Sequence, residues 1–95
     1  MGERVAVITG GARGIGRAIA LALAEQGWSL VVCYRKSQGE GVETEVAIRA
    51  RGVRGLAVQC DVSDPKAAEE FVRRVEKEWG RIDFLLAIAG GFAAG

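Results

Sequence analysis

The sequence predicts an α/β fold, a parallel sheet with helices on both of its faces. Short β-branched and apolar runs alternate with longer segments whose apolar residues recur at helical spacing, in the order βαβαβαβ. The short runs are apolar on both sides, as strands covered on two faces are. Strand–helix–strand units of this length make right-handed crossovers, which set consecutive strands parallel.

The first strand is expected over residues 4–9 (RVAVIT), followed by a helix over 15–26. The larger apolar residues of that helix, Ile15, Ile19 and Leu23, fall at helical spacing and form its predicted buried stripe. A glycine after the last residue of the segment is typical of a helix end.

The second strand is expected over 28–34 (WSLVVCY). In the helix after it, Val42, Val46 and Ala50 recur every four residues and form the predicted buried face. The charged residues of this segment are interpreted as a solvated face without a function, and they are Glu40, Glu43, Glu45, Arg49 and Arg51.

The third strand is expected over 55–60, and Asp64 before Pro65 predicts the start of the third helix. An apolar stripe then recurs at helical spacing, formed by Ala68, Phe71, Val72, Val75 and Trp79. The fourth strand is expected over 83–89 (DFLLAIA). Its outer edge has no later strand to cover it, so it invites pairing with another chain.

Composition limits the class of protein. A chain of 95 residues without a linker predicts one domain, and a net charge of +1 argues against a nucleic-acid or membrane-surface binder. No apolar run approaches the ~18 residues of a membrane span and no signal peptide is evident, so the cytoplasm is the expected compartment. The chain has no histidine, and Cys33 and Cys60 are expected to be reduced, buried thiols rather than a metal site.

The glycines at 10, 11, 14 and 16 lie where the first strand passes into the first helix. A glycine turn there leaves the first N–H groups of the helix bare for an anion, most often a phosphate. The dinucleotide pattern G-x-G-x-x-G is absent, and the P-loop pattern fails because Arg17 and Ala18 replace its lysine and hydroxyl. The turn therefore predicts a pyrophosphate cradle.

The remaining motif, Thr9-Gly10-x-x-x-Gly14-x-Gly16, resembles the T-G-x-x-x-G-x-G signature of the short-chain dehydrogenase/reductase family. The segment 60–63 (CDVS) resembles the family's adenine-binding aspartate, and 83–90 (DFLLAIAG) resembles its fourth strand. The resemblance implies a Rossmann-like sheet of order 3-2-1-4. It also implies that residues 1–95 form a single half of a dinucleotide-binding domain.

The resemblance implies a set of cofactor-binding residues, which are Thr9, Gly10, Arg13, Gly14, Ile15, Gly16, Tyr34, Arg35, Asp61, Val62, Ala89 and Gly90. NAD-using relatives usually carry an acidic residue at the end of the second strand. Here Tyr34 stands there, followed by Arg35 and Lys36, and Arg13 adds a charge within the glycine turn. The resemblance therefore implies NADP(H) as the cofactor.

The resemblance fails in the catalytic half. The family's Tyr-x-x-x-Lys pair is missing, because Gln38 stands four residues after the single tyrosine, Tyr34, and no serine follows Ser63. Ala87 and Ile88 also replace two asparagines of the family's fourth strand. We therefore expect cofactor binding without turnover.

Two alternatives remain open. One is a free-standing or engineered half-domain with a structural role, which binds nucleotide weakly or pairs with another chain, as a homodimer, through its fourth strand. The other is a reductase completed by a partner chain that carries a complementary C-terminal half with the catalytic tyrosine and lysine. Substrate identity is out of reach of the sequence.

Overall fold

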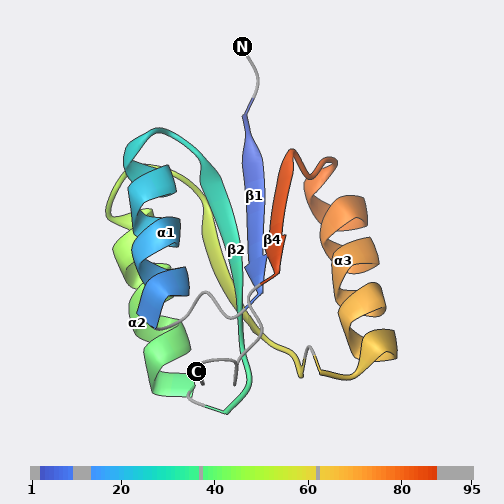
Figure 1. Ribbon diagram of the computed structural model, residues 1–95. Helices are drawn as coiled ribbons and strands as arrows, with labels where there is room; N and C mark the ends of the chain where they lie inside the picture. The colour runs from blue at the N-terminus through green and yellow to red at the C-terminus, as the bar shows by residue number, and fades with distance from the viewer. Residues whose placement is uncertain (1–2, 10–13, 37, 62, 88–95) are drawn as a thin grey trace.

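The computed structural model describes residues 3–9, 14–36, 38–61 and 63–87 (Figure 1). The elements run in the predicted order: β1 (Val5–Thr9), α1 (Gly14–Glu25), β2 (Ser29–Tyr34), α2 (Gln38–Arg49), β3 (Gly55–Gln59), α3 (Pro65–Trp79) and β4 (Phe84–Ala87). The expected bounds hold to within one or two residues within this part of the chain.

The four strands form one parallel sheet of order β3-β2-β1-β4. Val7 lies opposite Val31 of β2 and Leu85 of β4, and Val31 also lies opposite Leu56 of β3. β1 and β2 are therefore the inner strands. Helices α1 and α2 cover one face, and α3 covers the other (Figure 1). The predicted Rossmann-like α/β fold, with strand order 3-2-1-4, is confirmed.

The core consists of two apolar layers, one on each face of the sheet. Alternate residues of the inner strands point to opposite faces, since side chains alternate along a strand. The layer beneath α1 and α2 contains Ala6, Ile8, Ala20, Ala24, Leu30, Val32 and Ile48. The layer beneath α3 contains Val7, Val31, Cys33, Phe71 and Val75. Burial on both faces explains why the inner strands are continuously apolar in sequence.

Helix α1 packs on the sheet through small residues, which corrects the expected stripe. Gly16, Ala20 and Ala24 are its buried residues, whereas Ile19 and Leu23 are only partly buried. Ile15 is 75% exposed. Side chains without bulk let the helix approach the strands closely, so the larger residues lie along the flanks of the contact.

The predicted buried face of α2 is wrong. Val42 and Val46 are 53% and 60% exposed, and the helix instead buries Gly41, Thr44 and Ile48. A Cβ on Gly41 would lie 2.5 Å from Cδ1 of Tyr34, so this glycine is required by contact with the end of β2. Small residues again decide which side of the helix faces the sheet.

Helix α3 begins as predicted. Asp64 has an extended backbone, and its carboxylate accepts a hydrogen bond of 3.0 Å from the N–H of Lys66, with Pro65 at the first helical position. This arrangement satisfies one of the amide donors that a helix start leaves unpaired.

Both cysteines are free thiols, with Cys33 buried and Cys60 partly buried. Burial raises the pKa of the Cys33 thiol well above its usual range.

Candidate functional site

The candidate site lies at the carboxyl edge of the sheet, where parallel strands all end on the same side. Thr9 ends β1, Tyr34 ends β2, Asp61 follows β3, and α1 starts at Gly14. In open α/β sheets, ligands bind outside these strand ends, at the point where the strand order reverses. Here that point lies between β1 and β4, whose sequence numbers are not consecutive.

The start of α1 has the properties of an anion site. Gly14 has φ of +61°, which favours glycine, and nothing lies within 4 Å of the position that its Cβ would take. The first turn of the helix carries no acidic residue to offset the helix dipole. Ile15 projects into solvent at the same place. A phosphate-bearing ligand therefore fits this end of the helix.

Thr9 joins the ends of β1 and β4 beside this helix start. The residue is 6% exposed, and its hydroxyl lies 3.5 Å from the Leu86 carbonyl, at the outer limit for a hydrogen bond. The ladder of β1 and β4 continues to this point, with Thr9 opposite Ala87. The two strands at the switch point thus stay paired up to the edge.

In the turn after β2, residues 34–36, each backbone carbonyl accepts a hydrogen bond. The Tyr34 carbonyl accepts from the N–H of Cys60 at 2.9 Å. The Arg35 carbonyl accepts from the Gln59 side-chain amide at 3.2 Å, and the Lys36 carbonyl accepts from the N–H of Gln38 at 3.0 Å. The side chains of Arg35 and Lys36 are exposed. The backbone of this basic turn is therefore fixed while its two cationic side chains face solvent.

Gln59 was missed by sequence reasoning, because a glutamine at the end of an edge strand carries no motif. Tyr34, which the sequence assigns to the site, has a second role. Its ring packs over Gly41 of α2, so it also fixes how the helix sits on the end of β2.

Asp61 lies near the basic turn, and Ser63 orients its carboxylate. One carboxylate oxygen accepts from the Ser63 hydroxyl at 2.6 Å and from the Ser63 N–H at 3.0 Å. These hydrogen bonds hold the pKa of Asp61 below its usual range, and the positive charges of Arg35 and Lys36 lower that pKa further. The side chain is therefore an ionised acceptor beside two cations, suited to an amino or hydroxyl donor of a ligand.

Five of the predicted site residues, Gly10, Arg13, Val62, Ala89 and Gly90, lie outside the described residues. Across residues 3–9, 14–36, 38–61 and 63–87, no group of three or more His, Cys, Asp or Glu side chains gathers as metal ligands would. None of the helices in those ranges is both long and apolar enough to cross a membrane.

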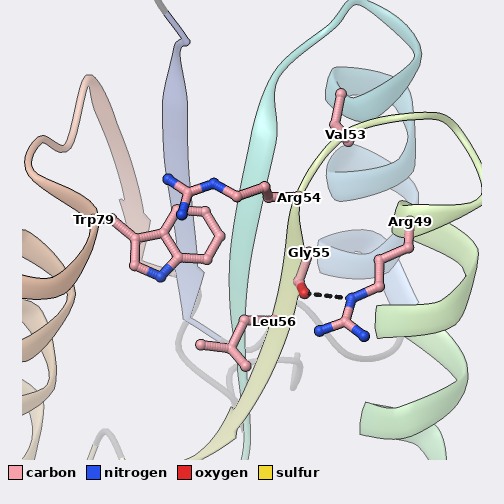
Figure 2. Close-up of a pocket in the computed structure, with 6 residues that line it drawn as sticks. All are labelled: Arg49, Val53, Arg54, Gly55, Leu56 and Trp79. Atoms are coloured by element: carbon pink, nitrogen blue, oxygen red, sulfur yellow. Dashed lines mark hydrogen bonds between the residues drawn. The ribbon is translucent and has the colours of Figure 1, made fainter.

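A cavity of about 320 Å³ lies elsewhere, beside the start of β3 (Figure 2). Two of the side chains that line it are arginines, and both already have partners within the chain. Arg49 donates to the Gly55 carbonyl at 2.9 Å. Arg54 lies 3.9 Å from the centre of the Trp79 ring and pairs with Glu3 at 2.6 Å. This hollow is at the amino edge of the sheet, opposite the edge where α1 starts, and we assign no ligand to it.

Comparisons with known proteins agree with this geometry. A family model described as short chain dehydrogenase matches residues 4–95. Over 88 residues, the chain is 38% identical to the 3-oxoacyl-(acyl-carrier-protein) reductase FabG of Staphylococcus epidermidis, covering 93% of this chain and 36% of the reductase.

Two solved structures show the same fold with different cofactors. A dehydrogenase from Burkholderia cenocepacia with bound NADP has a TM-score of 0.84 and 31% identity, over 90% of this chain and 33% of that one. An NAD+-bound xylitol dehydrogenase has a TM-score of 0.81 and 33% identity, over 86% of this chain and 31% of that one. The chain thus spans about a third of the length of the relatives it matches. With the family model matched over residues 4–95, the chain belongs to the short-chain dehydrogenase/reductase family of oxidoreductases.

Proposed function

We propose that this chain is the NADP(H)-binding portion of a short-chain dehydrogenase/reductase and that it is inactive alone. The observation that carries this proposal is the basic turn at residues 34–36. All three of its backbone carbonyls are engaged, while Arg35 and Lys36 remain exposed beside the carboxylate of Asp61. A fixed backbone with two presented cations suits the 2′-phosphate that distinguishes NADP from NAD.

The remaining residues fit the rest of the dinucleotide. The start of α1, with Gly14 and Gly16, suits the pyrophosphate, and Thr9 supports the strand end beneath it. Asp61 is an oriented, ionised acceptor for the adenine amino group. From the sequence, we assign Arg13 to the 2′-phosphate as well. Val62, Ala89 and Gly90 are assigned to close backbone approach.

The bound cofactor supplies hydride chemistry, but this chain lacks the side chains that move the proton. The family's acid–base pair needs a tyrosine four residues before a lysine, and the single tyrosine, Tyr34, is followed at that spacing by Gln38. The ring of Tyr34 is also engaged against Gly41. Binding without turnover is therefore the expected behaviour, and a complementary C-terminal half would have to supply the reaction.

Calorimetric titration of the chain with NADPH and NADH tests the proposal. A charge-assisted hydrogen bond contributes about 1.5–3 kcal/mol, so NADPH should bind about ten- to a hundredfold more tightly than NADH. Arg35→Ala should abolish that preference, whereas Arg73→Ala, which removes an exposed arginine from α3, should preserve it. Equal affinities in the unmodified chain would exclude recognition of the 2′-phosphate. A preference that survives Arg35→Ala would exclude the contact of Arg35 with that phosphate.

A second candidate is the free-standing or engineered half-domain, with a structural role in self-association and little nucleotide binding. Exposure of β4 favours it, since Phe84 and Leu85 are 42% and 48% exposed along that edge strand. An apolar edge strand with open backbone groups pairs readily with another chain. The absence of heat with either nucleotide from a folded chain would put this candidate first.

A further inference from the structure

The outer edge of β3 is bonded by side chains that the proposed cofactor site does not use. The N–H of Leu30 donates to the Arg54 carbonyl, and the N–H of Cys60 donates to the Tyr34 carbonyl. Residues 54 and 60 therefore turn their backbone groups toward β2. Because the groups of a parallel strand alternate in direction, Gly55 and Ala57 turn theirs outward, where a further strand would pair.

Two side chains of α2 occupy those outward groups. The N–H of Ala57 donates to Oε1 of Glu45 at 2.8 Å. The Gly55 carbonyl accepts from Nε of Arg49 at 2.9 Å, the contact drawn as a dashed line in Figure 2. The same two side chains bond each other, with Nη2 of Arg49 3.1 Å from Oε2 of Glu45. Together they supply one acceptor and one donor at the spacing of the strand, as a neighbouring strand would.

We propose that Glu45 and Arg49 form an edge cap that closes β3 to strand addition by a second copy of this chain. An arriving strand would have to displace both hydrogen bonds and break the ion pair. It would also strip water from Glu45, whose side chain is already only 23% exposed. These losses occur before any ladder bond forms, so pairing at β3 is unfavourable.

The approach of α2 that makes the cap possible depends on a glycine. A Cβ on Gly55 would lie 2.7 Å from Cγ2 of Ile48 and 3.3 Å from the Glu45 carbonyl. The helix therefore lies closer to β3 than any other residue at this position would allow. Because the helix lies so close, the carboxylate of Glu45 reaches the backbone N–H of Ala57.

The test replaces both cap residues with methionine, which keeps the packing of the stems and removes the polar atoms. The matched control is Glu69→Met with Arg73→Met, the same residue types at the same spacing on α3, where they form only an exposed ion pair. A rescue variant, Glu45→Gln with Arg49→Lys, keeps one acceptor and one donor. Sedimentation velocity over a concentration series measures association, and amide exchange at Ala57 identifies the edge.

In the cap variant, association should reach its midpoint at a concentration at least tenfold lower than in the control or rescue variants. The Ala57 amide should exchange rapidly when dilute and become protected as the protein associates. If the folded cap variant sediments like the control, with Ala57 exchanging freely at every concentration, the cap does not keep the edge closed. If the double variant fails to fold, Arg49→Met alone must still associate more readily than Arg73→Met, and equal association would overturn the proposal.

Discussion

The two edges of the sheet differ in how their outward backbone groups are treated. At β3, Glu45 and Arg49 reach down from α2 and bond the strand directly. At β4, no described residue bonds the outer side of the strand, and Phe84 and Leu85 are 42% and 48% exposed. Both are edge strands of one parallel sheet, so strand type does not explain the contrast. The difference lies in whether a helix approaches closely enough for its polar side chains to bond the strand backbone.

Gly55→Ala should break the closed edge with the largest effect on stability. The new methyl group must push Ile48 and the backbone of Glu45 away, since they lie 2.7 Å and 3.3 Å from its position. Overpacking of this kind costs about 1–3 kcal/mol, and the shifted helix would also weaken the edge cap. The free energy of unfolding in urea measures the loss.

Gly39→Ala is the matched control for that change. Gly39 lies in α2, the helix that packs against Gly55, but nothing lies within 4 Å of the position that its Cβ would take. Alanine should stabilise the helix there by up to about 1 kcal/mol. If both variants lost stability equally, close packing between Gly55 and α2 would not hold the edge.

The closed edge also shows where sequence patterns stop being informative. The order of strands and helices could be predicted because periodicity and glycine positions are local properties. The orientation of α2 could not, since Val42 and Val46 have the right spacing for a buried stripe but the sheet selects Gly41, Thr44 and Ile48. Contact with β3 decides this, and it is absent from the local pattern.

Leu85→Lys should weaken association at the open edge, with an intermediate effect. A charge on an edge strand opposes pairing because it must be desolvated against the partner. Any self-association of the chain should weaken by about tenfold, which corresponds to about 1.4 kcal/mol. Val46→Lys places the same charge on an apolar side chain that is 60% exposed on α2, and it should leave association unchanged. Equal weakening by both substitutions in sedimentation would point to net charge rather than to β4.

Acid should loosen the attachment of β4, with the smallest of the three effects. The carboxylate of Asp83 accepts from the N–H of Val5 at 2.8 Å and from Arg81. The Arg81 hydrogen bonds, followed by the Val5 amide, lower the pKa of Asp83 in the folded state. A lowered folded pKa stabilises the fold above the unfolded value near 3.8, and that stability is lost as the pH falls through the folded pKa.

Asp83→Asn keeps an acceptor for the Val5 amide and removes this titration. Its urea midpoint should therefore fall less than that of the unmodified chain between pH 5 and about pH 2. Glu3, which pairs with Arg54 on the β3 side, also has a lowered pKa. Because both proteins keep Glu3, its titration contributes equally to both acid profiles. Identical acid profiles for the two proteins would mean that Asp83 does not contribute through its charge.

The position of the candidate site could be predicted from the sequence. The residues that hold the site residues in place could not. Gly14, Arg35 and Asp61 belong to motifs whose spacing is readable, and all three lie at the carboxyl edge of the sheet. Gln59 holds the Arg35 carbonyl, and Ser63 orients Asp61. Such supporting contacts depend on where neighbouring segments fall in space, so an isolated polar residue in the sequence does not reveal them.

The pairing of β1 with β4 has a consequence for synthesis on the ribosome. Val5 and Asp83 exchange hydrogen bonds across a sequence separation of 78 residues. At translation rates of about 5–20 residues per second, β1 waits roughly 4–16 s for this neighbour. β2 is made much sooner, so one side of the most buried strand is covered early while the other stays open. During that interval, the unpaired edge of β1 is open to pairing with strands other than β4.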